Sequence, residues 1–96
     1  MKSDIEIGCY LQKLRKERKM SLREVAEHVG IDISMLSKIE HGERQVQGHM
    51  LKSISEIFEI DYKKLCVNFY SNKLNESFGD SPFIIEAAKT WLSKIQ

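Results

Sequence analysis

The sequence predicts an all-α fold of five helices followed by one further C-terminal helix. Apolar residues recur at spacings of three and four along most of the chain, which is the period of an amphipathic helix. One proline occurs in 96 residues, and no stretch alternates as a half-buried strand does. With 42% hydrophobic and 30% charged residues, the composition is that of a soluble globular domain.

The first two predicted helices are separated by a strong start signal. A helix is expected from about residue 4 to residue 19, with three apolar residues on one face: Ile7, Leu11 and Leu14. Ser21 is a good N-cap for the next helix, and Glu24 completes a capping box three residues later. Gly30 suits a left-handed C-terminal cap, so this second helix is short.

The middle of the chain predicts two more helices and a loop. Asp32 or Ser34 caps a third helix that ends at Gly42, and residues 43–47 are polar and predict a loop. A fourth helix follows, with an apolar face made of Met50, Leu51, Ile54, Ile57 and Phe58.

Two helices are predicted in the remainder. Asp61 caps the fifth, which carries Leu65 and Phe69, and its continuation to Leu74 is left open. The break at residues 79–82 predicts Ser81 as the cap of the last helix and Pro82 as its first residue. The last helix has a broad apolar stripe: Ile84, Ala87, Ala88, Trp91, Leu92 and Ile95.

Residues 22–41 have the features of a helix-turn-helix. Two short helices are joined by a tight turn at Gly30, and the small side chain of Ala26 allows them to cross closely. Four apolar residues are placed to hold the pair together: Val25, Ile31, Leu36 and Ile39. Their burial leaves a small, polar outer face on the third helix, which fits a major groove about 12 Å wide. That face consists of Asp32, Ile33, Ser34, Ser37, Lys38 and His41.

The chain resembles the phage-repressor/Cro-like (XRE-type) helix-turn-helix family, with some features of restriction–modification controllers. The resemblance is carried by residues 14–26, 30–32, 36–44 and 60–65, and extends over about residues 7–66. It implies a lambda repressor-like DNA-binding domain and a function as a transcriptional regulator. A repressor or autoregulator that reads an inverted-repeat operator as a homodimer is expected.

The resemblance also implies roles for single residues. The residues expected at base edges are Ile33, Ser34, Ser37 and Lys38, with Asp32 beside them. Those expected at phosphates are Ser21, Arg23, His41, Arg44 and Gln45. Arg15 and Glu40 are expected to form a structural ion pair between the first helix and the end of the third.

Three positions depart from the family pattern. Leu22 stands where many members have a glutamine that contacts phosphate, and Val46 replaces a frequent proline. Gln47-Gly48 replaces the usual serine or threonine cap, so the fourth helix is expected to start less firmly. None of these positions lies on the third helix.

The chain divides into a DNA-binding domain (residues 1–66) and a helical extension (residues 67–96) of the same compact unit. The apolar stripe of the extension packs either on its own domain or on a second copy, and a homodimer is favoured because an inverted repeat needs two half-sites. The expected dimer interface is Phe83, Ile84, Ala87, Ala88, Trp91, Leu92 and Ile95.

Other functions find less support in the sequence. An antitoxin or anti-repressor that binds a protein through its C-terminal helices is the main alternative.

Enzymatic activity is not expected, because no nucleophile has a positioned base. Cys9 and Cys66 form no CxxC pair, and the three histidines have no ligand spacing, so neither a metal nor a cofactor is expected. No signal peptide or membrane span is expected, which indicates a cytoplasmic protein.

The net charge of +1 does not by itself indicate a nucleic-acid partner. The basic residues are nevertheless clustered, since five of them fall within seven positions: Lys13, Arg15, Lys16, Arg18 and Lys19. Such a cluster is either a solvated helix face or part of a DNA-facing surface.

Overall fold

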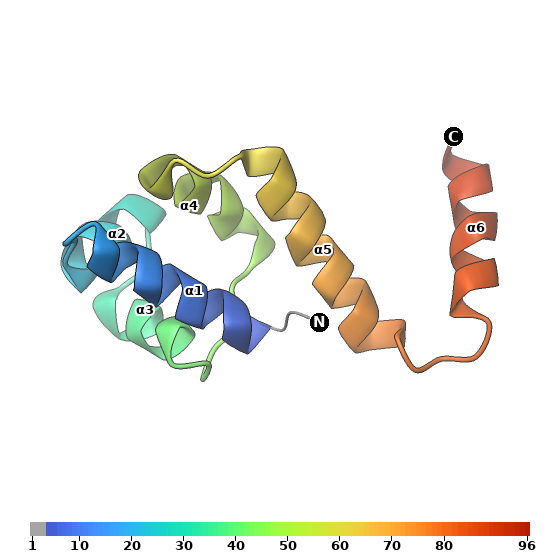
Figure 1. Cartoon of the computed structure of the whole chain (residues 1–96), viewed down its shortest axis with the longest axis horizontal. Helices are drawn as coiled ribbons and strands as arrows, with labels where there is room; N and C mark the ends of the chain where they lie inside the picture. Colours follow the sequence, from blue (N-terminus) through green and yellow to red (C-terminus); the bar gives the residue numbers. More distant parts are fainter. Residues whose placement is uncertain (1–3) are drawn as a thin grey trace.

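The computed structural model describes residues 4–96, and all of its regular elements in that range are helical (Figure 1). The all-α prediction is confirmed. The helices are α1 (Asp4–Glu17), α2 (Leu22–Val29), α3 (Ile33–Glu40), α4 (Leu51–Phe58), α5 (Tyr62–Phe78) and α6 (Ile84–Ile95), with a 3₁₀ turn η1 (Gly48–Met50) before α4.

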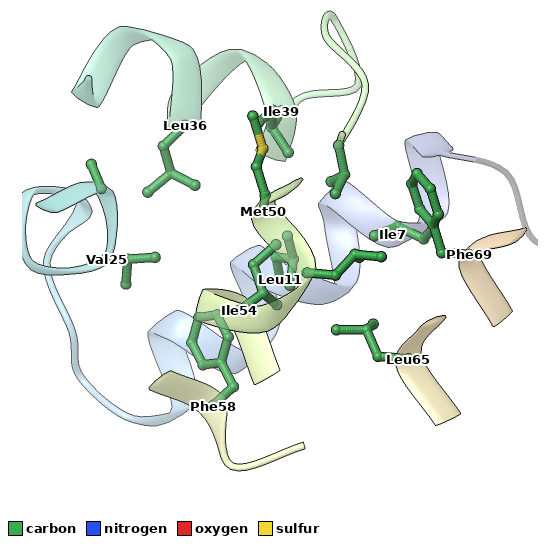
Figure 2. Close-up of a cluster of buried hydrophobic side chains, with 13 residues drawn as sticks. Ile7, Leu11, Val25, Leu36, Ile39, Met50, Ile54, Phe58, Leu65 and Phe69 are labelled. Atoms are coloured by element: carbon green, nitrogen blue, oxygen red, sulfur yellow. The ribbon is translucent and has the colours of Figure 1, made fainter. Parts of the chain in front are cut away.

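Helices α1 to α5 enclose one hydrophobic core. Helix α1 packs on α3, α2 packs on both α3 and α4, and α4 packs on α5. The core extends from Val25 and Leu36 at the α2–α3 end to Leu65 and Phe69 of α5 (Figure 2). Because every helix from α1 to α5 contributes buried side chains, the positions of α2 and α3 are set by the whole unit.

The caps of α2 and α3 follow the predictions. The Ser21 hydroxyl accepts from the Glu24 N–H, and the Glu24 carboxylate accepts from the Ser21 N–H. Gly30 ends α2 in the left-handed region, with φ of 84°. Of the two candidate caps for α3, Asp32 is the one used, and Gly42 has φ of 77° just after α3.

Helix α1 ends two residues before the expected Lys19. Lys19 itself adopts a left-handed conformation, with φ of 55°. The Met20 N–H then donates to the Arg15 carbonyl and the Lys19 N–H to the Lys16 carbonyl, which is the Schellman arrangement. The helix therefore stops at Glu17 although no glycine is present to indicate it.

The start of α4 has no side-chain cap, in keeping with the missing serine or threonine. Gln47 makes no side-chain capping bond, and the chain enters α4 through the 3₁₀ turn η1. The preceding loop is not exposed throughout, because Val46 is only 1% exposed and belongs to the core. An apolar residue at this position thus anchors the loop that follows α3.

The predicted start of the last helix is wrong. Ser81 and Pro82 lie in a turn that continues from α5, where the Ser81 N–H donates to the Phe78 carbonyl. Phe83, with φ of 63°, then breaks the helical path, so α6 begins at Ile84 without a side-chain cap. Helix α5 is also longer than expected, since it extends past Leu74 to Phe78.

Helix α6 stands apart from the rest of the molecule (Figure 1). The radius of gyration is 15.3 Å, against about 12.5 Å expected for a compact chain of this length. In this structure α6 does not lie on its own domain, and all its residues but the half-buried Ile84 are exposed. The domain boundary at residue 66 remains a prediction, and α5 passes through it without a break.

Candidate DNA-binding interface

The α2–turn–α3 unit is held by the apolar residues that the sequence indicated. Val25, Ala26, Leu36 and Ile39 are each at most 3% exposed, and Ile31 packs against them in the turn. The Gly30 and Ile31 N–H groups both donate to the Ala26 carbonyl, which closes the end of α2. With these residues buried, α3 has only one face left for a partner.

That outer face of α3 carries the residues expected at base edges. Ile33, Ser34 and Lys38 are exposed, while Ser37 is half-buried beside them. The exposed side chains are short, apart from the flexible Lys38, so nothing bulky projects from the face. Hydroxyl, ammonium and methyl groups of this kind match the donors, acceptors and thymine methyl of a major groove.

Asp32 lies at the edge of this face and has a structural duty. Its carboxylate oxygen Oδ1 accepts a 2.6 Å hydrogen bond from the Met35 N–H, which caps α3. The side chain is exposed. A carboxylate oxygen can accept a hydrogen bond from the amino group of cytosine.

The start of α2 offers backbone N–H groups to an anion. Ser21 forms the capping box: its backbone N–H donates to the Glu24 carboxylate and its hydroxyl oxygen accepts from the Glu24 N–H, so the hydroxyl hydrogen is not used in this motif. The next two N–H groups, of Leu22 and Arg23, belong to the first helical turn and have no intrahelical acceptor. The Arg23 side chain beside them is exposed, and such groups at the positive end of a helix can bind an anion.

The loop after α3 carries the other expected phosphate ligands. His41 Nδ1 lies 2.7 Å from the Ser37 carbonyl oxygen, so Nδ1 carries the proton and Nε2 faces outward. Arg44 is exposed. The Gln45 side-chain oxygen accepts from Lys73 Nζ at 3.0 Å, which leaves its NH₂ group for a phosphate. Lys73 therefore ties this loop to α5.

Arg15 and Glu40 form the expected ion pair between α1 and α3. Arg15 Nε lies 2.7 Å from one Glu40 oxygen and Nη2 lies 3.0 Å from the other, while Nη1 donates to the Met20 carbonyl. The side chains are only 12% and 2% exposed. The hydrogen bond with Glu40 raises the pKa of Arg15 above its usual value, although burial acts in the opposite direction.

The basic cluster of α1 is divided between structural and exposed residues. Arg15 is paired internally, and Arg18 donates to the Phe58 carbonyl at the end of α4 and lies 5.7 Å from the Phe58 ring centre. Lys13, Lys16 and Lys19 remain exposed. Two of the five cations thus hold helices together, and the other three are exposed to solvent.

Two residues that support the interface were not anticipated. Gly8 brings α1 close to α3, because a Cβ at this position would lie 1.9 Å from the Ile39 carbonyl oxygen. The signal was a glycine inside a helical pattern, which usually has a packing reason. The contact between Lys73 and Gln45 had no such signal, because it joins residues 28 positions apart.

An α2–turn–α3 unit with one small polar face on its second helix defines a helix-turn-helix module, the class of protein that inserts a recognition helix into DNA. The family described as Helix-turn-helix domain matches residues 8–70, about two thirds of the chain. The chain therefore belongs to the XRE-like helix-turn-helix family, whose members are DNA-binding regulators of transcription.

Two proteins are similar to this chain. The HTH-type transcriptional repressor RghR of Bacillus subtilis is 34% identical over 59 residues, which is 60% of this chain and 44% of that protein's length. The crystal structure of the clp gene regulator ClgR from Corynebacterium glutamicum superposes with a TM-score of 0.59 at 20% identity. That match covers 96% of this chain and 87% of the other, and it supports the fold.

Within the part of the chain that the structure describes, no helix is long and apolar enough to cross a bilayer.

Proposed function

We propose that this protein is a sequence-specific repressor that reads an inverted-repeat operator as a homodimer, with α3 of each copy in one half-site. The observation that carries the proposal is the exposed face of α3, where Ile33, Ser34 and Lys38 stand clear of the core. Repression is favoured by the 34% identity to a protein described as a transcriptional repressor.

In the proposed complex, base contacts determine the sequence preference and phosphate contacts position the protein. Lys38 donates to guanine, Ser34 and Ser37 bond to base edges, and Ile33 packs on a thymine methyl. The N-terminus of α2 with Ser21 and Arg23 contacts one phosphate group, while His41, Arg44 and Gln45 contact another. The phosphate contacts orient α3 in the groove and make the affinity depend on salt.

A pair of single substitutions tests this division of duties. Lys38→Ala should cost about 1–3 kcal/mol on the preferred operator and relax the preference at one base pair, because a base contact is lost. Arg44→Ala should weaken binding to all duplexes alike and reduce the salt slope by about 1, because only a phosphate contact is lost. Binding curves on the selected operator and on single-base variants measure both effects. Equal losses on every duplex for Lys38→Ala would contradict its assignment to a base.

A second candidate function is an antitoxin or anti-repressor that captures another protein through its C-terminal helices. It is favoured by the exposed apolar residues of α6, among them Trp91 and Leu92. Purified protein that forms no homodimer and binds no DNA in a sequence-dependent way would favour this candidate over the repressor.

A further inference from the structure

Helix α5 is apolar on two opposite faces. Its inner face buries Leu65 and Phe69 in the core. Its outer face carries four large side chains at spacings of three and four, and they are between 48% and 61% exposed: Val67, Tyr70, Leu74 and Phe78. At 100° per residue this second stripe lies directly opposite the first. A helix that is apolar on both sides is normally covered on both sides.

Helix α6 carries a second uncovered stripe. Its large apolar residues are exposed, including Ile85, Trp91, Leu92 and Ile95, while its charged and hydroxyl residues lie on the other side. From the turn at residues 79–83 the two helices diverge, so α6 does not cover the outer face of α5 in the same chain (Figure 1). Phe83, with φ of 63° and 76% exposed, is the last residue of this turn.

We propose that α6 of one copy packs on the outer face of α5 of a second copy, and that the second copy returns the same contact. This exchanged arrangement rests on the proposed function, because it specifies how the homodimer is built. It is isologous, as a two-fold dimer on an inverted repeat requires. In this arrangement the stripe of α6 is covered by α5 of the second copy, and not by the α6 stripe of that copy.

The exposed area supports a second copy as the occupant. The two stripes and Phe83 of the turn between them together contain nine large exposed apolar side chains. At about 100 Å² each, they amount to on the order of 900 Å² per chain, which is more than the largest patch of a typical monomer and close to the ~800 Å² per partner of a stable interface. Contact between α5 helices alone would cover only four of the nine.

Complementation between two variants tests the exchange. One variant disables the α5 face (Tyr70→Glu with Leu74→Glu) and keeps α6 intact. The other disables the α6 stripe (Trp91→Lys with Leu92→Lys) and keeps α5 intact.

The matched control is Thr90→Lys with Ser93→Lys on the polar side of α6. All of these residues are exposed, so the core of α1 to α5 should stay folded, as far-UV circular dichroism will check. Sedimentation equilibrium without DNA, with one variant labelled at its N-terminus, measures association.

The exchange makes a specific pattern of association. Each variant alone should be monomeric, with a dissociation constant raised at least about 100-fold, because both of its contacts are broken. An equimolar mixture should form a heterodimer, because intact α6 of the α5 variant meets intact α5 of the α6 variant. The control should dimerise like the wild type.

Three results would overturn the inference: a monomeric wild type, either variant dimerising alone, or a mixture that stays monomeric. Contact between two α6 helices would leave the α5 variant dimeric, and contact between two α5 helices would leave the α6 variant dimeric. Folding of α6 onto its own α5 would make the wild type monomeric. Operator binding is measured separately with Ser34→Ala/Lys38→Ala, which should dimerise normally. The proposed function can therefore fail while the exchange stands, and the reverse can also occur.

Discussion

Arg15 illustrates how a residue in a basic cluster can serve the fold rather than the ligand. Its guanidinium binds both oxygens of Glu40 and the Met20 carbonyl, so it joins α1, the following turn and the end of α3. The pair is almost fully enclosed, and the hydrogen bond with Glu40 raises the pKa of Arg15. Composition alone would have assigned this cation to DNA.

Arg15→Ala is expected to lower the free energy of unfolding by about 3 kcal/mol, because it leaves the Glu40 charge buried without a partner. The base preference of the folded protein should not change, since Arg15 lies away from the exposed face of α3. Urea unfolding measures the first effect and operator selection the second. The control is Lys16→Ala, an exposed neighbour that should change stability by less than ~0.5 kcal/mol. Wild-type stability with lost DNA binding would contradict the structural assignment.

Gly8→Ala should destabilise the protein by about 1–3 kcal/mol, because the added methyl group meets the Ile39 backbone and α1 must move away from α3. Gly48→Ala is the matched control, since its Cβ would meet only the Tyr70 hydroxyl at 3.4 Å. Thermal unfolding of the two variants compares them directly. Equal melting temperatures would mean that the helices can separate at Gly8 without cost.

At the scale of elements, the sequence predicted the helix ends that use the expected chemistry. Ser21, Asp32 and Asp61 cap helices with side chains, and Gly30 ends one in the left-handed region. Helices α1 and α4 end in the same backbone geometry, but with Lys19 and Glu59 in the left-handed position. Lysine and glutamate rarely adopt a positive φ, so packing of the flanking helices and not local preference sets these helix ends. For this reason no local pattern indicated them.

Lys19→Gly should therefore stabilise the protein by about 0.5–1 kcal/mol, because glycine adopts a positive φ without the penalty of a side chain. Lys13→Gly is the control: within α1 it removes an exposed lysine of the same cluster, and it should cost about 1 kcal/mol. Chemical denaturation of both variants measures whether each substitution raises or lowers the free energy of unfolding. A loss of stability at Lys19 would indicate that the lysine side chain itself makes a stabilising contact.

The recognition element was predictable because its pattern is local. The spacing from Val25 to Ile39 determines which side of α3 is buried, and the exposed side follows from it. The start of α6 was not predictable in this way. Ser81-Pro82 is a good start signal, yet these residues form a turn that continues from α5. Phe83 then breaks the helical path, and α6 begins only after it.

At the scale of the whole molecule, most long-range features were not predicted; the exception is the Arg15–Glu40 pair, which the family resemblance implied. The five helices of the core and their apolar faces follow from periodicity. The tie between Gln45 and Lys73, the close approach at Gly8 and the detached position of α6 depend on residues far apart in the chain. Composition indicated an apolar C-terminal third, but only the arrangement of α5 and α6 shows two uncovered stripes.

The central claim is that α3 reads an operator, and titration of the protein on the DNA upstream of its own gene tests it most directly. The titration is made at two salt concentrations, with wild type and the Ser34→Ala/Lys38→Ala variant. We expect tight wild-type binding with two protomers per site, an affinity that falls with salt, and loss of the sequence preference in the variant. Equal binding of wild type and variant, with no preference at either salt concentration, would contradict it.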